Sequence, residues 1–183
     1  MGYRHSKDEI LEAAVAFVLE EGLSRLTFGA VASRIGISDR IVVYYFPTKD
    51  DLIVEVLRTI GDRLQDALGP SLSTRVPNHV EFVRAVWPSL TNRRSDSVFA
   101  VFFEASGLAS AGIEPYRSLA PALVNGWIAW AEESIDGNEA HRREQAAAAI
   151  ATIDGLLLLR RLSGPTMANR AQTAIVGRGR RAR

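Results

Sequence analysis

The sequence has no cysteine and no long uninterrupted apolar stretch. Without cysteine, disulfides, thiolate zinc sites and cysteine nucleophiles are excluded, and a reducing cytoplasm is a natural location. The first residues lack the apolar core of a signal peptide. The longest apolar run, residues 146–159, is interrupted by Asp154 and is too short to cross a bilayer. We therefore expect a cytoplasmic protein that has no membrane segment.

Motifs for catalysis and metal binding are also missing. The histidines His5, His79 and His141 are scattered, and no His/carboxylate cluster has metal-ligand spacing. There is no Gly-x-Ser-x-Gly elbow and no phosphate-binding glycine loop. The sequence therefore predicts a protein that is not an enzyme and that uses no cofactor and no metal.

The chain has almost no net charge, because its 22 Lys and Arg are balanced by 21 Asp and Glu. Residues 1–60 contain seven Lys and Arg and nine Asp and Glu, so this segment is not basic overall. From Arg170 onward there are five arginines and no acids, and residues 177–183 are expected to be a basic disordered tail. Such a tail either touches phosphates or stays solvated. The argument for nucleic-acid binding therefore depends on the positions of individual side chains and not on the overall charge.

What is present is helical periodicity, which runs through the chain and predicts an all-α protein. A capping box at residues 6–9 opens a first helix that ends at Gly22. Thr27 caps a second helix, which stops at Gly36. Ser38 caps a third helix only two residues later. A helix, a glycine turn and a capped short helix are typical of a helix-turn-helix.

The rest of the chain is expected to be a larger helical domain. A second capping signature at residues 48–51 opens a long amphipathic helix that ends near Gly69-Pro70, and residues 71–78 are expected to form a loop. Further helices are expected at about 79–92, 96–110, 115–135, 139–163 and 166–176, with Pro88 kinking or splitting the first of them. We place the helix-turn-helix domain at 1–48, a ligand-binding and dimerisation domain at 49–176, and the tail at 177–183.

A family resemblance is carried by motifs within residues 7–53. They are Ala13-Ala14 with Phe17, Gly22 followed by Leu26-Thr27, Val31-Ala32, Gly36-Ile37-Ser38, and the block Tyr44-Tyr45-Phe46-Pro47-Thr48-Lys49-Asp50-Asp51-Leu52. In these motifs the segment resembles the DNA-binding domain of the TetR family of bacterial repressors. The resemblance implies a homodimer that binds a palindromic operator on double-stranded DNA. It also implies a small apolar or amphipathic effector that releases the protein from the operator.

The third helix must divide its residues between the core and the major groove. Val42, Tyr45 and Phe46 have anchoring spacing, so the positions that face outward are Asp39, Arg40, Ile41, Val43 and Tyr44. We expect Asp39 to accept from a cytosine amino group or to favour the helix N-terminus, Arg40 to bind guanine or phosphate, and Ile41 and Val43 to meet thymine methyl groups. The family often has a lysine, a small residue, a threonine and a tyrosine at positions 39, 40, 41 and 43, so we expect an altered operator sequence.

Phosphate contacts are expected from side chains next to the recognition helix. The candidates are Thr27, Ser33, Ser38, Tyr44 and Lys49, of which Thr27, Tyr44 and Lys49 match backbone-contacting positions by the resemblance. Capping alone also explains Thr27 and Ser38. Lys49 is the stronger candidate, because its capping neighbours do not require a lysine.

Candidates for the effector pocket and the dimer interface lie in the larger domain. The pocket candidates are aromatic residues with one acid among them: Trp87, Phe99, Phe102, Phe103, Glu104, Trp127 and Trp130. These aromatics can equally fill the core of a helical bundle. The dimer candidates are Ile150, Ile153 and Leu157, although this alanine-rich helix can equally pack internally. Asp154 points either at the pocket or across the dimer.

One alternative belongs to a different functional class. The chain would then be a helical interaction module whose helix-turn-helix binds a protein partner rather than DNA. The near-neutral charge of the N-terminal segment favours this alternative, and the placement of Lys49 and Tyr44 disfavours it.

Overall fold

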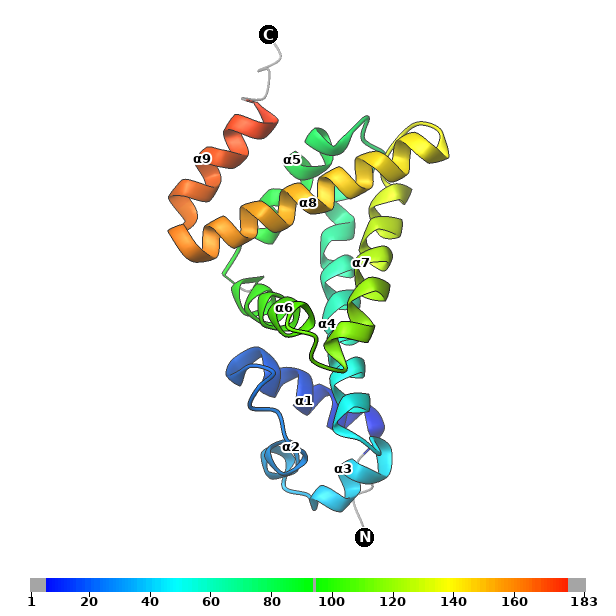
Figure 1. Cartoon of the computed structure of the whole chain (residues 1–183), viewed down its shortest axis with the longest axis vertical. Coiled ribbons are helices and arrows are strands. Elements are labelled where there is room, and N and C mark those ends of the chain that lie inside the picture. Colours follow the sequence, from blue (N-terminus) through cyan, green and yellow to red (C-terminus); the bar gives the residue numbers. More distant parts are fainter. Residues whose placement is uncertain (1–5, 94, 178–183) are drawn as a thin grey trace. The chain divides into compact units, whose positions relative to one another are not determined.

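The computed structural model describes residues 6–93 and 95–177, and within these ranges the chain is helical and has no β-strand (Figure 1). The predicted all-α class, with an N-terminal helix-turn-helix and a larger helical region after it, is therefore confirmed. A lone parallel bridge pairs Val76 with Ile135. Apart from Gly177, the predicted basic tail lies outside the described residues.

The helices follow one another with short connections. Their bounds are α1 Lys7–Glu21, α2 Phe28–Ile35, α3 Asp39–Tyr45, α4 Lys49–Leu68, the 3-10 helix η1 Gly69–Leu72, α5 His79–Leu90, α6 Ser95–Ser110, α7 Tyr116–Glu133, α8 Glu139–Ser163 and α9 Pro165–Val176.

Side-chain caps fix the helix starts that the sequence predicted. Ser6 and Glu9 form a reciprocal capping box: the Ser6 Oγ accepts from the Glu9 N–H at 3.2 Å, and a Glu9 carboxylate oxygen accepts from the Ser6 N–H at 2.9 Å. Thr48 and Asp51 make the same exchange before α4, with distances of 3.1 and 3.0 Å. The two capping signatures are therefore confirmed.

The structure excludes a split at Pro88, one of the two effects predicted for it, and it shortens the predicted loop after residue 70. Helix α5 runs from His79 to Leu90 with Pro88 inside it, so the proline does not split the helix. Pro88 lies in the last turn, where it removes one backbone hydrogen bond and little helix remains to be broken. The expected loop after residue 70 begins later, because η1 extends to Leu72.

The chain forms two compact units. The first comprises residues up to 64 together with 96–123, and the second comprises residues 65–95 together with those from 124 onward. The first unit extends past the boundary expected at residue 48. The reason is its core, because Leu52 and Val56 of α4 and Val101 of α6 are buried in the same cluster as Val18 and Phe46.

The second unit is built on contacts among α5, α8 and α9. Helix α5 buries Phe82, Val86 and Leu90, and α8 buries Ala146, Ala149, Ile153 and Leu157. Polar contacts join the helices as well: the Trp87 indole N–H donates to the Asn169 side-chain oxygen at 3.0 Å. On α5, the N–H of His79 donates to the Gln145 side-chain oxygen at 3.0 Å.

None of the helices in the described part of the chain is both long and apolar enough to cross a membrane. Residues 6–93 and 95–177 also contain no group of three or more His, Asp or Glu side chains arranged to hold a metal ion.

Candidate nucleic-acid interface

Helix α3 has one buried side and one exposed side. Val42 and Phe46 are 0% and 1% exposed, and both belong to the core of the first unit. Tyr45 is half-buried against the same core. Asp39, Arg40, Ile41, Val43 and Tyr44 are exposed, with 37% for Ile41, 42% for Val43 and 79% for Tyr44. This division matches the one predicted from helical spacing.

The exposed side chains occupy different parts of the outer surface of α3. Successive residues of an α-helix are separated by about 100° around its axis. Arg40 and Tyr44 are therefore close together on the ridge opposite the core, and Ile41 and Val43 lie on either side of that ridge. The surface that α3 presents has a polar ridge between two aliphatic flanks.

The turn before α3 is held by its backbone. Gly36 has φ +70°, in the left-handed region that a side chain with a β-carbon disfavours. The N–H of Ile37 then donates to the carbonyl of Ala32 at 3.0 Å. Ser38 begins α3, with its Oγ accepting from the Arg40 N–H at 3.3 Å. These contacts hold α3 at a fixed angle to α2.

The residues whose hydroxyl groups are candidates for phosphate contact differ in the hydrogen bonds that they make within the protein. The Thr27 Oγ1 accepts from the Ala30 N–H at 3.1 Å, so Thr27 caps α2. Ser38 likewise caps α3. Ser33 is exposed on α2, and Thr27, Ser38 and Lys49 are exposed as well. All of the predicted DNA-facing side chains are thus on the surface of the first unit.

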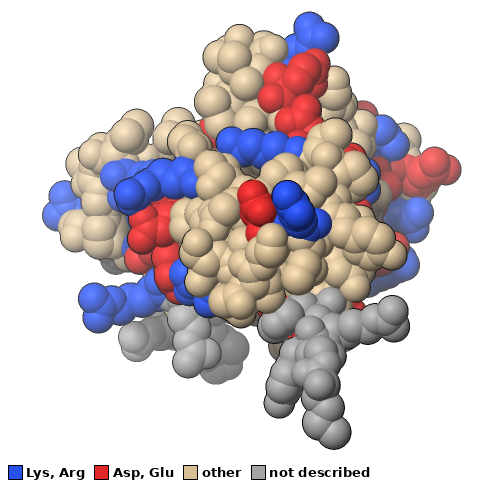
Figure 2. All heavy atoms as spheres, turned by 90° about the horizontal axis from the view of Figure 1, so that it is seen from below, with Lys and Arg blue, Asp and Glu red and all other residues tan. Residues whose placement is uncertain are grey.

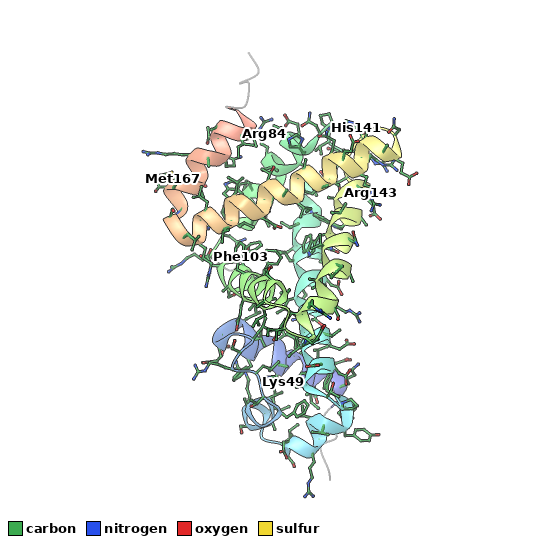
Figure 3. All side chains as sticks on the ribbon, viewed as in Figure 1. Lys49, Arg84, Phe103, His141, Arg143 and Met167 are labelled. Carbon is green, nitrogen blue, oxygen red and sulfur yellow. The ribbon has the colours of Figure 1, made fainter. Side chains whose placement is uncertain are left out.

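Cations around α3 fall into two groups. Arg25 pairs with Glu21, and Arg34 pairs with Glu20 at 2.6 Å. Arg40 and Lys49, in contrast, form no ion pair with any carboxylate of the described residues. Arg40 lies near the start of α3, and Lys49 opens α4 just after it (Figure 3). Two cations without an ion-pair partner among the described residues are therefore exposed here, Arg40 on the ridge of α3 and Lys49 at the start of the next helix.

Seen from the side of α2 and α3, the surface is not a continuous basic patch (Figure 2). Uncharged side chains cover most of its centre, and isolated Lys, Arg, Asp and Glu side chains lie among them. This mixture agrees with the small acidic excess of residues 1–60.

Comparisons with known proteins agree with this geometry. Residues 10–56 match the family model of bacterial regulatory proteins of the tetR family. This segment contains α2, α3 and the turn between them, and most of α1. We call residues 10–56, which match this model and contain the helix-turn-helix, the TetR-type domain. A search of curated proteins gave no match to the chain.

Solved structures extend the likeness in fold beyond the TetR-type domain. A transcriptional regulator from Rhodococcus sp. RHA1 has 22% sequence identity and a TM-score of 0.73, over 94% of this chain and 95% of that one. The multidrug binding protein EbrR, complexed with proflavin, has 23% identity and a TM-score of 0.68, over 92% and 96%. A transcriptional regulator from Saccharomonospora viridis in complex with choline has 21% identity and a TM-score of 0.67, over 92% of each chain. The chain therefore has the fold of these regulators.

The predicted pocket residues are divided between the two units. Phe99, Phe102, Phe103 and Glu104 are on α6 in the first unit, and Trp87, Trp127 and Trp130 are in the second. Within the second unit, Trp130 makes edge contacts with Trp127 at 5.5 Å and with Phe82 at 5.7 Å between ring centroids. Trp87 is buried and bound to Asn169. Glu104 binds the backbone at the end of α1, a contact that no sequence motif indicated.

Asp154 of α8 is an acid in an apolar setting. Burial raises the pKa of its carboxyl from 3.8 to about 6. No hydrogen bond or ion pair to Asp154 occurs among residues 6–93 and 95–177. A cation close to this carboxylate would therefore relieve the cost of its charge.

The dimer candidates of α8 are mostly inside the single chain. Ile153 and Leu157 are 7% and 3% exposed, and Ile150 is half-buried. They point inward because they share the side of α8 that carries the buried alanines. The exposed side is a separate stripe at helical spacing, and its members are Ala147, Ala151, Gly155, Leu158 and Leu162. Met167 of α9 is also exposed (Figure 3).

Proposed function

We propose that the chain is a homodimeric transcriptional repressor that inserts α3 into the major groove of a palindromic operator. The observation that carries the proposal is the exposed face of α3, which includes Arg40, is anchored from behind by Val42 and Phe46, and is followed by the exposed Lys49 at the start of α4. The major groove is wide enough for a helix, and its walls are anionic. A short helix whose outer ridge is exposed and carries the cation Arg40, with Lys49 at the start of the next helix, fits this environment.

The side chains of this face suggest how the operator is read. Arg40 on the ridge can bind the two acceptors of a guanine, while Asp39 can accept from a cytosine amino group. The aliphatic flanks formed by Ile41 and Val43 fit the methyl groups that thymines present in the same groove. We therefore propose half-sites that contain a guanine close to thymines.

Contacts to the DNA backbone set the register of the helix without reading the sequence. We assign this role to Lys49, with Thr27, Ser33, Ser38 and Tyr44 as further candidates, because all are exposed around α3. Thr27 and Ser38 also cap helices, so their hydroxyl groups serve the fold in addition to any phosphate contact.

Dimerisation places two such domains on a two-fold symmetric site. We propose that the interface uses the exposed stripe of α8, in which Ala147, Ala151 and Gly155 allow close approach and Leu158 and Leu162 supply apolar area. Leu162 is 76% exposed in the single chain, and Leu158 is 42% exposed. Large exposed apolar side chains in one stripe are typical of an interaction surface.

We further propose that a small amphipathic effector releases the repressor. The aromatic residues Trp127 and Trp130 and the half-buried carboxylate of Asp154 would favour an amphipathic cation. Two proteins of the same fold were crystallised with organic cations, the multidrug binding protein EbrR with proflavin and the regulator from Saccharomonospora viridis with choline. Release requires that the effector bind the operator-free state more tightly than the operator-bound state. The proposal includes no catalytic step.

Proflavin and choline are practical probes for this effector. We expect proflavin to bind the purified protein and to weaken its operator affinity, with Asp154→Asn binding proflavin about tenfold more weakly. Asp136→Asn changes an exposed aspartate of the same unit and is the matched control. Equal binding of proflavin by the wild type and Asp154→Asn would remove Asp154 from the site.

The decisive experiment for DNA binding is selection of bound duplexes from a random DNA pool. We expect recovery of a palindrome whose half-sites are about one helical turn, or a multiple of it, apart. Tyr44→Ala and Arg40→Ala are expected to recover it poorly, because both change only the exposed ridge of α3. A pool that shows no enrichment after repeated rounds would contradict the proposal.

The second candidate function is a helix-turn-helix that binds a protein partner. The acidic excess of residues 1–60 is the observation that favours it. Salt separates the two candidates, because DNA binding weakens steeply with added salt through counterion release. An apolar protein contact is much less sensitive to salt.

A further inference from the structure

Glu104 of α6 binds the turn that follows α1. One carboxylate oxygen accepts from the Leu23 N–H at 2.9 Å. The other accepts from the Ser24 N–H at 2.8 Å and from the Ser24 hydroxyl at 2.5 Å. Eighty or more residues of chain separate these partners, yet all of them belong to the first unit.

The turn is shaped to receive this carboxylate. Gly22 has φ +90°, and a Cβ added there would lie 3.0 Å from a Glu104 carboxylate oxygen. Burial acts to raise the pKa of Glu104, but the hydrogen bonds from Ser24 and Leu23 outweigh it and hold the pKa below its usual value. Glu104 is therefore ionised at neutral pH, and its hydrogen bonds are of the stronger, charge-assisted kind.

Helix α6 is joined to the TetR-type domain along one face. Val98, Val101, Ala105 and Leu108 recur at helical spacing and pack into or against the core that also contains Val18 and Phe46. Glu104 lies at the edge of this face. Phe99 and Phe103 lie on the opposite face of α6, because they are displaced from that stripe by more than a quarter turn. The apolar stripe and the carboxylate thus bind the same domain.

The Glu104 contact lies close to the start of α2. The bound turn contains Leu23 and Ser24, and Thr27 caps α2 only three residues after Ser24. Leu23 and Leu26, on either side of the bound serine, are fully buried. Fixing this turn therefore fixes where α2 begins, and the Gly36 turn then fixes α3 against α2.

We propose that Glu104 is a positioning residue, which holds the α1–α2 turn on α6 and so sets the orientation in which α2 and α3 meet the operator. The inference rests on the proposed function. In a dimer, the orientation of each domain determines the distance between the two recognition helices. Glu104 therefore governs discrimination between operators of different half-site spacing, rather than recognition of the half-site bases.

The test compares Glu104→Gln with the wild type on the selected palindrome and on versions lengthened by one and two base pairs between half-sites. We expect the preference of the wild type for the original spacing to fall about tenfold in Glu104→Gln, the scale of losing one hydrogen bond to a charged group. The base preferences within each half-site are expected to stay the same. Ser24→Ala, which removes one of three bonds, is expected to give a smaller loss and serves if Glu104→Gln does not fold.

A second measurement is independent of DNA. Amide hydrogen exchange at Leu23 and Ser24 is expected to be faster in Glu104→Gln, while exchange at Ile37, whose N–H bonds to Ala32, stays the same. The matched control is Glu21→Gln, a like change to an exposed glutamate that pairs with Arg25 beside the same turn.

The outcomes are distinct. Wild-type spacing discrimination in Glu104→Gln overturns the positioning role, and it does so even if Leu23 and Ser24 exchange faster, because the contact is then only structural. Unchanged exchange at both amides overturns the contact itself. If the DNA pool gives no enriched sequence, the proposed function fails, while the exchange experiment still decides whether Glu104 holds the turn.

Discussion

Tyr44 and Tyr45 are neighbours in sequence and pack edge to face, with ring centroids 5.0 Å apart and ring planes at 85°. Tyr44 is 79% exposed, whereas Tyr45 packs against the core of the first unit. The contact places an exposed ring of the candidate DNA-binding ridge directly on a ring that helps to anchor α3. The same division between an exposed and a buried side chain separates Val42 from Val43 on this helix.

Val42 and Val43 give the cleanest test of that division, because they are the same residue type at adjacent positions. Val42→Ala removes fully buried methyl groups and is expected to lower the free energy of unfolding by about 2 kcal/mol. Val43→Ala, at a 42% exposed position, is expected to change it by less than about 0.5 kcal/mol. Urea unfolding followed by circular dichroism measures both. Equal destabilisation by the two variants would show that α3 does not present this face to solvent.

Arg40 and Lys49 are expected to differ in what they recognise. Arg40→Ala should weaken binding to the selected operator by about tenfold to a hundredfold, with little effect on random DNA, because a base contact is lost. Lys49→Ala should weaken binding to both duplexes and reduce the salt dependence, because a phosphate contact is lost. Fluorescence anisotropy at several salt concentrations measures both effects. Equal losses on the two duplexes for Arg40→Ala would refute its base-reading role.

Ile41 and Val43 are expected to recognise thymine methyl groups. Replacing a contacted thymine by uracil removes only the methyl group and should weaken wild-type binding by about fourfold, the value of one buried methyl group. In the variant that has lost the contacting side chain, Ile41→Ala or Val43→Ala, the same replacement should have no effect. A full uracil penalty in both variants would assign the methyl contact to other residues.

Leu162 is expected to lie in the dimer interface. Leu162→Asp should shift the protein from dimer to monomer in sedimentation velocity without unfolding it, because this side chain is 76% exposed in the single chain. Ile113→Asp is the control, since Ile113 is also large and exposed but lies in the first unit. A Leu162→Asp protein that remains dimeric would move the interface away from this stripe.

Asp154 is expected to make stability depend on pH. Its pKa in the folded chain is about 6, raised by burial from 3.8, so between pH 4 and 6 the folded state holds a proton that the unfolded chain releases. The free energy of unfolding therefore falls as the pH rises through this window and stays lower above it. Asp154→Asn should remove this fall. At pH 7.5 it should raise the free energy of unfolding by an amount on the order of 3 kcal/mol. Urea unfolding at pH 4.5 and 7.5 tests this, and an identical pH dependence in the wild type and the variant would contradict it.

Much of the local structure was predictable, because it depends on residues that are neighbours in sequence. The capping pairs Ser6 with Glu9 and Thr48 with Asp51 are three residues apart, and the glycine turn at Gly36 is equally local. The burial of Val42 and Phe46 and the exposure of Tyr44 follow from helical spacing in the same way. The family likeness of residues 10–56 lies in the same local motifs.

Other features required the folded chain. Helical spacing identifies two sides of α8 but does not say which faces inward, and the packing of α5 and α9 buries Ile153 and Leu157 while leaving Leu158 and Leu162 exposed. The sequence suggested Glu104 only as a pocket candidate, and folding brings its carboxylate instead to the amides of Leu23 and Ser24. The sequence by itself determined where helices begin and end and which face of α3 is apolar, because those depend on caps and periodicity. Tertiary structure decided what each face meets, because contacts between distant residues depend on how the helices pack.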